Sequence, residues 1–291
     1  MEKLVLIDGH SILNRAFYGV PNLTNSEGLH TNAVYGFLNI LFKVLDEEKA
    51  DYLAVAFDLK APTFRHKMFD AYKGTRKPMP EELHEQVPLM KEVLTAMGVP
   101  ILTKEGYEAD DILGTIAKRE QKDGYEVTIL SGDRDLLQLS DTHIRICLPK
   151  TSRGTTEVHN YYLMGDQSDN IPGVPSIGEK TATNLIVQYQ NLENIYTHLD
   201  EVKPPRAKKA LEEHRDLAEL SLKLARICVD APIEFSMADA KLENLYTPEA
   251  YEYMKRLEFK SIAARFGEGI RNESGPEKQF VLVEDFSEAD A

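Results

Sequence analysis

The chain has 291 residues, of which 42% are hydrophobic and 28% charged, an ordinary balance for a globular protein with a sizeable core. Its two cysteines, Cys147 and Cys228, lack metal-type spacing, and no apolar run is long enough to span a membrane. A disulfide scaffold and a membrane protein are therefore excluded, and we expect a cytoplasmic location. The formal net charge of −14 argues against a nucleic acid partner unless the basic residues are grouped.

Three short apolar runs predict buried strands of a parallel sheet: residues 3–7, 52–57 and 125–130. Each run leads to an aspartate: Asp8, Asp58 and Asp133. A helical pattern lies at 32–45, and helices alternating with apolar strands predict a doubly wound α/β sheet. Because ligands of such sheets bind beyond the carboxyl ends of the strands, we expect these aspartates to meet at one edge. Each one alone could cap a helix, but independent capping does not explain the repetition.

Residues 60–77 supply grouped positive charge. They hold six cations and a single acid: Lys60, Arg65, Lys67, Lys73, Arg76 and Lys77 against Asp70. Aromatic residues such as Tyr72 are interleaved with these cations, a mixture that suits phosphate binding and base stacking. The alternative is a solvated loop whose aromatic rings pack into the core. The proximity of Asp58 favours the first interpretation, and a helical pattern resumes at 83–97.

Residues 107–137 hold the densest group of carboxylates: Glu108, Asp110, Asp111, Asp133 and Asp135. Carboxylates at close range disfavour joint ionisation unless cations lie between them, so we interpret the group as a metal site. On a helix Glu108 and Asp111 share a face, while Asp110 projects elsewhere, toward a second ion or a metal-bound water. Compensation of the helix dipole is the alternative for Glu108 and Asp111. Oxygen ligands without cysteine or clustered histidine favour Mg²⁺ or Mn²⁺ over Zn²⁺.

From Leu163 onward the sequence becomes helical in character. Asp166 and Asp169 add two carboxylates, and residues 173–178 form a short hairpin before a helix that begins near Lys180. The backbone N–H groups of such a hairpin, together with the N-terminus of the next helix, can face a phosphate.

Five segments, in order, resemble the 5′–3′ exonuclease (flap endonuclease) domain of bacterial DNA polymerase I over residues 1–267: DGHSILNRAFYG, VAFDLKAPTFRHKMFDAYKGTRKPMP, YEADDILGTIA, LSGDRDLLQL and LMGDQSDNIPGVPSIGEKTA. The resemblance implies a PIN/5′-nuclease-like α/β fold, with a mostly parallel central sheet flanked by helices and a C-terminal helical subdomain containing a helix-hairpin-helix. It implies three regions: a catalytic core at 1–161 with a helical arch at about 60–97, a helical DNA-binding subdomain at 162–267, and an acidic linker at 268–291 toward a missing next domain.

The resemblance also implies the site residues, position by position. The first metal position is formed by five acids: Asp8, Asp58, Glu108, Asp110 and Asp111. The second is formed by four: Asp133, Asp135, Asp166 and Asp169. Two or more Mg²⁺ (or Mn²⁺) ions are expected, and K⁺ at the helix-hairpin-helix, where family members often hold it. The implied catalytic residues are Lys73 and Arg76, which contact the scissile phosphate, with Asp8, Asp58 and Asp111. The residues expected to contact nucleic acid are Arg15, Arg65, Lys67, Tyr72, Lys73, Arg76, Gly173, Gly178 and Lys180.

The expected function is a structure-specific 5′ nuclease of the bacterial cytoplasm. It would act as a monomer on 5′-flap, nicked or primer-ended duplex DNA in replication and repair, with polymerase domains on the same polypeptide. Two metal ions, about 3.5–4 Å apart, would activate a water and stabilise the leaving oxygen. Two alternatives stay open: a catalytically silent DNA-junction binding module and a PIN-type ribonuclease. One departure from the family is a shortened segment between Glu157 and Leu163, which bears on the placement of Asp166 and Asp169.

Overall fold

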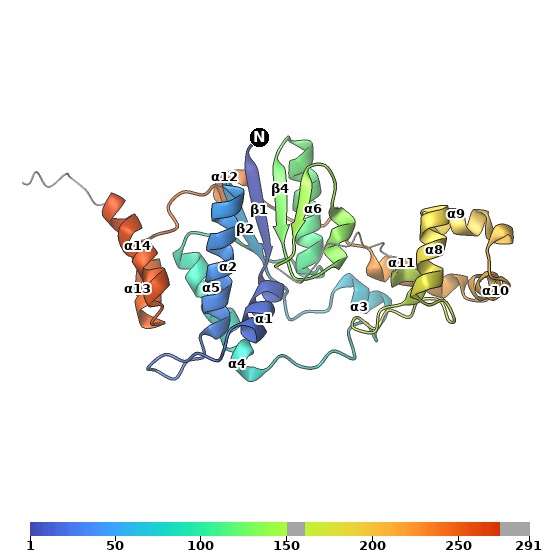
Figure 1. Ribbon diagram of the computed structural model, residues 1–291, viewed down its shortest axis with the longest axis horizontal. Coiled ribbons are helices and arrows are strands. Elements are labelled where there is room, and N and C mark those ends of the chain that lie inside the picture. Colours follow the sequence, from blue (N-terminus) through green and yellow to red (C-terminus); the bar gives the residue numbers. More distant parts are fainter. Residues whose placement is uncertain (150–160, 274–291) are drawn as a thin grey trace, which may run out of the picture.

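The computed structural model describes residues 1–149 and 161–273 and is centred on a five-stranded sheet (Figure 1). All neighbouring strands are parallel, in the order β3-β2-β1-β4-β5. The strands are β1 (Lys3–Asp8), β2 (Tyr52–Ala56), β3 (Ile101–Leu102), β4 (Glu126–Leu130) and β5 (Ile144–Cys147). The predicted α/β class with a parallel central sheet is confirmed. Because the strand order reverses between β1 and β4, a ligand crevice is expected at the carboxyl ends of these two strands.

Both faces of the sheet are covered, which is why its longer strands are continuous apolar runs. Alternate residues of β1 enter two different hydrophobic cores. The register places Asp8 beside Ala56 of β2, and Ile7 beside Leu130 of β4, so the three central strands end at nearly the same level. The sequence did not predict β3 or β5, because two and four residues are too few to form a recognisable apolar run.

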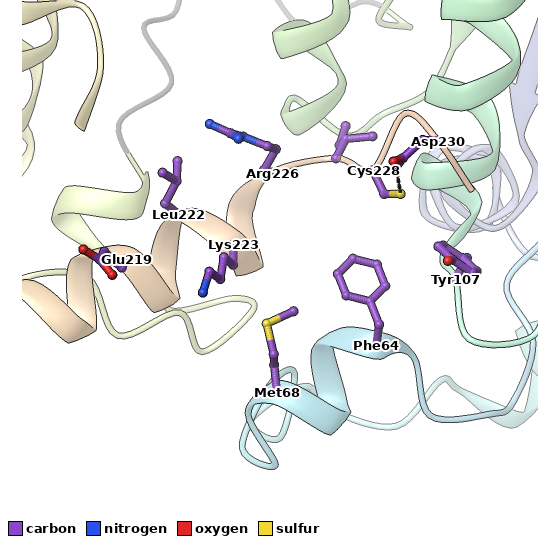
Figure 2. A pocket seen from close by; sticks show the side chains of 10 residues that line it. Phe64, Met68, Tyr107, Glu219, Leu222, Lys223, Arg226, Cys228 and Asp230 are labelled. Carbon is purple, nitrogen blue, oxygen red and sulfur yellow. Dashed lines mark hydrogen bonds between the residues drawn. The ribbon is translucent and has the colours of Figure 1, made fainter. Parts of the chain in front are cut away.

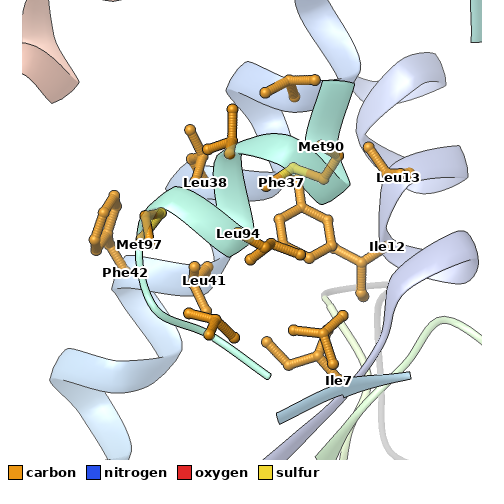
Figure 3. Packing of buried hydrophobic residues seen from close by; sticks show 14 of the residues in the cluster. Ile7, Ile12, Leu13, Phe37, Leu38, Leu41, Phe42, Met90, Leu94 and Met97 are labelled. Carbon is orange, nitrogen blue, oxygen red and sulfur yellow. The ribbon is translucent and has the colours of Figure 1, made fainter. Parts of the chain in front are cut away.

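Helices cover the two faces of the sheet (Figure 1). On one face lie α1 (Gly9–Gly19), α2 (Asn32–Glu48) and α5 (Gln86–Ala96), and on the other lies α6 (Ala109–Lys122). Figure 3 shows how Phe37 of α2 packs among Ile12 and Leu13 of α1 and Met90 and Leu94 of α5. These helices hold β1 and β2 rigidly, and with them the acids at their ends.

The fully buried Gln86 joins α5 to α2. Its Oε1 accepts the N–H groups of Ala33 (2.8 Å) and Val34 (3.2 Å), which are left unpaired at the start of α2 because no side chain of the N-cap residue reaches them. Its amide nitrogen donates to Asn32 Oδ1 (3.1 Å) and to the carbonyl of Glu82 (2.9 Å). All four hydrogen-bonding positions of this buried amide are therefore used.

The other helices complete the description. They are α3 (Phe64–Met68), α4 (Glu81–His84), α7 (Tyr161–Met164), α8 (Glu179–Tyr189), α9 (Leu192–Thr197), α10 (Pro205–Glu213), α11 (Arg215–Ala225), α12 (Met237–Ala240), α13 (Pro248–Arg256) and α14 (Lys260–Glu273), with 3-10 turns η1 (Asp135–Leu139) and η2 (Leu199–Glu201). Across the part of the chain that is described, no helix combines the length and apolar character needed to cross a membrane. The shortened segment after Glu157, within residues 150–160, and the end of the expected linker, 274–291, lie outside the described residues.

Helices α7 to α11 have a hydrophobic core of their own, and α8, α9 and α10 project away from the sheet (Figure 1). After α11 the chain returns to the α/β core. Ile227 packs with the residues of α6, while Met254 of α13 and Phe266 of α14 pack with those of α2. This differs from the predicted single helical unit at 162–267, and α14 also continues past residue 267 to Glu273. The amphipathic pattern in the sequence shows that each of these helices buries one face, but it does not show whether that face packs against the α/β core or against the other C-terminal helices.

The segment expected to be a helical arch at about 60–97 contains α3, α4 and α5, of which only α5 exceeds five residues. The turn between α3 and α4 is attached to the helical subdomain. The N–H of Lys73 donates to the carbonyl of Asp169 (2.9 Å), and the amide of Asn170 donates to the carbonyl of Ala71 (2.7 Å). This turn, residues 69–80, is called the basic turn below. It lies directly beside Asp169, whose side chain belongs to the candidate site.

Candidate active site

Asp8 and Asp58 lie at the carboxyl ends of β1 and β2. Asp8 caps α1: its Oδ1 accepts the N–H of Ser11 (3.0 Å), and its Oδ2 accepts the hydroxyl of Ser131 (2.9 Å). Oδ1 of Asp58 accepts the N–H of Ala109, the first residue of α6 (2.7 Å). Strand ends and helix N-termini thus hold both carboxylates in the crevice that the strand order defines.

Asp110 projects from α6 toward the same crevice. Burial, and then the charges of Asp8, Asp133 and Asp58, raise its pKa well above the ordinary value. Burial likewise raises the pKa of Asp8 to about 7. Among the described residues, Oδ1 of Asp110 is the single buried side-chain nitrogen or oxygen without a hydrogen-bond partner. A cation among these carboxylates would offset their mutual repulsion and give Oδ1 of Asp110 a partner, and such hard oxygen ligands fit Mg²⁺ or Mn²⁺.

A second group of acids joins the end of β4 to the helical subdomain. Asp135, Asp166 and Asp169 each offer an oxygen, and the three oxygens lie within 4.8 Å of one another. Burial raises the pKa of Asp135 to about 7, and the charges of Asp133, Asp169 and Asp166 add to the effect. This donor set also fits a divalent cation. The structure therefore brings together three of the four acids expected at the second metal position, while the fourth, Asp133, lines the space beside both groups.

Lys73 and Arg76 contact the acids from the turn after α3. Lys73 Nζ lies 2.9 Å from Glu108 Oε1 and 3.8 Å from Asp169 Oδ2. Nε of Arg76 donates to Asp169 Oδ1 (3.0 Å). Burial opposes the charge of Lys73, but Glu108 and Asp169 outweigh it and raise the pKa of its ammonium group. The ammonium therefore stays charged in the crevice at neutral pH.

Asp111 does not face the other acids. Arg65 holds it in a buried bidentate pair, with Nη1–Oδ2 and Nη2–Oδ1 distances of 2.7 and 2.8 Å. Its oxygens also accept the N–H groups of Glu108 (3.1 Å) and Cys228 (2.8 Å). These four hydrogen bonds occupy both oxygens, which leaves no room for a metal ion. The structure thus contradicts the expected ligand role of Asp111, and it makes Asp110 the residue of α6 that faces the carboxylate group.

Two residues expected to contact nucleic acid are buried instead. Arg65 is 3% exposed, and besides pairing with Asp111 it donates to the carbonyls of Leu224 (2.9 Å) and Arg226 (2.9 Å). Tyr72 is 4% exposed, with its hydroxyl 3.2 Å from carboxylate oxygens of both Glu108 and Asp169. Neither side chain is available to DNA. The residue types suit phosphate and base contacts, but their spacing does not show that both turn toward buried acids.

The other expected DNA-contacting residues are spread over three regions. Lys67 of α3 and Arg76 of the turn that follows it are exposed, Lys180 and Gly178 are exposed at the start of α8, and Arg15 is half-buried in α1. None of these five residues is buried, so all five are accessible to DNA. Their role in DNA binding stays a prediction.

Gly173 differs from that expectation, because it is buried and its N–H donates to the hydroxyl of Ser221 (2.9 Å). Its φ of +63° and the approach of Gly165, whose nitrogen would lie 2.2 Å from an added Cβ, require a glycine. The residue therefore shapes the hairpin rather than offering its N–H to a phosphate. The helix-hairpin-helix itself stays a prediction.

The cavity of the crevice, about 510 Å³, is also lined by Lys60, one of the grouped cations that the sequence predicted to lie near Asp58. Three further lining residues were not predicted: His10, Asn14 and His84. Nδ1 of His10 accepts the N–H of Asp58 (3.2 Å) and so positions the end of β2. The only sequence signal is the position of His10 two residues after a strand-end aspartate, which is too general to mark a site residue.

Carboxylates gathered at the switch point of a parallel sheet, with two cations beside them, characterise a metal-dependent nuclease, a phosphodiester hydrolase. The chain belongs to the 5′-3′ exonuclease family: the N-terminal resolvase-like domain of that family matches residues 3–164, and its C-terminal SAM fold matches residues 156–247.

Relatives that match this chain include DNA polymerases I. The enzyme of Bacillus caldotenax is 43% identical over 94% of this chain, and the thermostable enzyme of Thermus thermophilus is 40% identical over 91%. The chain spans about a third of the length of these relatives, 33% in both cases.

Solved structures confirm the fold. T5 5′-exonuclease superposes with a TM-score of 0.62 at 20% identity, over 93% of this chain and 99% of its own. The catalytic core of Rad2 in complex with DNA substrate gives a TM-score of 0.54 at 14% identity, over 91% of this chain and 92% of its own. At these identities the likeness concerns the fold.

The raised pKa values of Asp8 and Asp135, about 7 in the fold against 3.8 ordinarily, predict how metal stabilisation depends on pH. In the metal-free fold the two carboxyl groups bind protons more tightly than in the unfolded chain. The stability that these bound protons contribute is fully present below about pH 4 and is lost as the pH rises through about 7. We expect Mg²⁺ to raise the free energy of unfolding, and with it the melting temperature, more at pH 8 than at pH 5.5; the difference in free energy should be on the order of 2 kcal/mol for each carboxylate. Thermal melts in Mg²⁺ and in EDTA, at equal ionic strength, measure the difference. An equal or larger Mg²⁺ effect at pH 5.5 would contradict the placement of metal at these acids.

Proposed function

We propose that this chain is the structure-specific 5′ nuclease part of a bacterial DNA polymerase I and works in the cytoplasm as a monomeric unit of that longer polypeptide. It would hydrolyse phosphodiesters at 5′ flaps, nicks and RNA-primer ends on duplex DNA, in replication and repair. The chain matches about a third of the length of its polymerase relatives, which supports its place within a longer polymerase polypeptide. The T5 D15 flap endonuclease, whose structure with DNA and metal ions superposes with a TM-score of 0.63, supports the second.

The observation that carries the proposal is the unpaired, buried oxygen of Asp110 in a cavity that Lys73 and Arg76 also line. Asp8, Asp58, Asp110 and Asp133 would hold one divalent ion, and Asp135, Asp166 and Asp169 another. When bound, such ions supply a means to activate water and to stabilise charge on the reacting phosphate. A module that only binds DNA gains nothing from so many carboxylates beside a polyanion.

The chain's own cations would bind the phosphate. Lys73 and Arg76 are paired with Glu108 and Asp169 in the structure, and a phosphate in the cavity competes with these acids for the same N–H groups. Transfer of the two cations to the phosphate leaves Glu108 and Asp169 free to face a metal ion. Phosphate binding and completion of the metal site are therefore expected to support each other.

Cleavage of a 5′-labelled flap substrate with Mg²⁺, beside an EDTA control, tests the function. We expect a product within about one nucleotide of the junction, ending in a 3′ hydroxyl, and no product in EDTA. Tight binding without product at any Mg²⁺ concentration would instead favour a junction-binding module.

The substitution Lys73→Met tests the phosphate contact. It keeps most of the aliphatic stem and removes the charge, so we expect kcat to fall about 10²- to 10³-fold, as when one preorganised donor to a developing anion is lost. The change in KM should be smaller. Steady-state cleavage of the flap substrate measures both parameters. Lys122→Met, at the exposed end of α6, is the matched control and should cleave normally. A rise in KM alone would mean that Lys73 binds the substrate without acting in the transition state.

A further inference from the structure

A second cavity lies apart from the acidic crevice, between α3, the end of α11 and the segment that follows it (Figure 2). Its volume is about 510 Å³, within the range of sites that bind small ligands. None of the residues discussed above as a metal ligand or catalytic group lines it. The cavity therefore needs an account of its own.

One wall of this second cavity is aromatic and apolar. The ring of Phe64 points into the space between α3 and α11 (Figure 2), and the ring of Tyr107 lies 5.7 Å from it, centroid to centroid. Met68 also lines the cavity and is 42% exposed, so its apolar side chain is open to a ligand. This wall offers a flat ligand a surface on which to stack.

The opposite wall carries positive charge. The side chains of Lys223 and Arg226 form no hydrogen bond or ion pair with another residue in the described part of the chain. The acid nearest to them on α11, Glu219, is paired with Arg215 (2.9 Å), and Asp230 accepts the thiol of Cys228 (2.9 Å). Two unpaired cations beside an aromatic surface favour a ligand that is both planar and anionic.

We propose that this cavity binds one nucleotide of an unpaired DNA or RNA strand, with the base on Phe64 and Met68 and the phosphate on Lys223 and Arg226. The inference deepens the proposed function and rests on it, because the unpaired strand is then the 5′ flap. Stacking accepts any base, so no sequence preference is expected. The cavity is also linked to the crevice: Arg65 lies 4.5 Å from the Phe64 ring and 3.6 Å from Glu108, the partner of Lys73 in the crevice.

Binding of a fluorescein-labelled oligothymidylate, measured by anisotropy in EDTA, tests the cavity without any cleavage. We expect the double variant Lys223→Gln/Arg226→Gln to bind roughly ten-fold more weakly than the unaltered chain, and Phe64→Leu to lose a similar factor. The matched control is Lys43→Gln/Lys255→Gln, which removes the same charge from exposed positions on α2 and α13. Equal affinities of the two double variants would overturn the proposal.

Photocrosslinking gives an independent measurement on the unaltered chain. An oligonucleotide carrying 5-iododeoxyuridine should crosslink to peptides that contain Phe64, Met68 or Tyr107, and crosslinks confined to the acidic crevice would overturn the proposal. Cleavage separates this inference from the proposed function. The variant Lys223→Gln/Arg226→Gln should cleave a nick without a flap normally and a long flap more slowly. If the unaltered chain cleaves neither substrate, the proposed function fails, while the binding and crosslinking results still decide about the cavity.

Discussion

Replacement of Asp110 by asparagine is expected to lower flap cleavage by about 10³-fold or more, equivalent to about 4 kcal/mol, and at the same time to stabilise the metal-free protein. The carboxylate is buried near Asp8, Asp58 and Asp133, and its Oδ1 has no partner among the described residues. Asparagine keeps the shape and removes the charge. Repulsion within the group falls, but so does its capacity to hold a divalent ion.

Three measurements check this expectation: single-turnover cleavage, thermal melting in EDTA, and the rise in melting temperature on addition of Mg²⁺. The variant Asp110→Asn should lose most of the Mg²⁺ effect and melt higher than the unaltered chain in EDTA. Asp70→Asn, an exposed aspartate on the basic turn, is the matched control and should change none of the three. Near-normal cleavage by Asp110→Asn, or a lower melting temperature in EDTA, would show that Asp110 is not the residue of α6 that faces the metal.

The general design could be predicted from the sequence because it depends on local signals. Continuous apolar runs mark β1, β2 and β4, and the aspartates after them fall at one edge because the strands are parallel and in register. Helical spacing places Glu108 and Asp111 on one face, and in the structure both contact Arg65. What spacing cannot show is which face of α6 turns toward the crevice. That rotation depends on contacts between residues far apart in the chain, such as the hydrogen bond from Ala109 to Asp58 and the packing of Ile112 and Ile116 on the sheet.

The basic turn illustrates the same limit. Its composition correctly indicates positive charge beside Asp58, and Lys73 and Arg76 do line the cavity. Arg65 and Tyr72 look equivalent to them in the sequence, yet both are buried. The partners that bury Arg65 are the carbonyls of Leu224 and Arg226, about 160 residues later. No local pattern encodes such a contact, so charge and spacing alone assigned Arg65 to the DNA.

The buried pair of Arg65 and Asp111 leads to the largest stability effect that we expect. The substitution Arg65→Met removes the cation and leaves the Asp111 carboxylate buried, with only the N–H groups of Glu108 and Cys228 as partners. Removal of one member of a buried ion pair typically costs about 3–5 kcal/mol, because the remaining charge is uncompensated. Urea unfolding of the metal-free protein measures this loss. Lys67→Met, an exposed cation two residues further along α3, is the matched control and should change stability by less than about 0.5 kcal/mol.

A second substitution separates the loss of charge pairing from the loss of packing. In Arg65→Met/Asp111→Asn the buried charge is gone and the amide oxygen still accepts one of the two backbone N–H groups that Asp111 binds, so the double variant should be more stable than Arg65→Met alone. In the unaltered chain, Asp111→Asn removes a partner from Arg65 and should destabilise the fold. If the two side chains are paired, the same substitution stabilises only in the Arg65→Met background, so the sign of its effect reverses between the two backgrounds. The alternative, that Arg65 binds a phosphate of the DNA, is tested by measuring the DNA affinity of Arg65→Met. If Arg65→Met weakened DNA binding while the free energy of unfolding stayed unchanged, Arg65 would be a phosphate-binding residue after all, and the pair that holds Asp111 away from the metal would have to be abandoned.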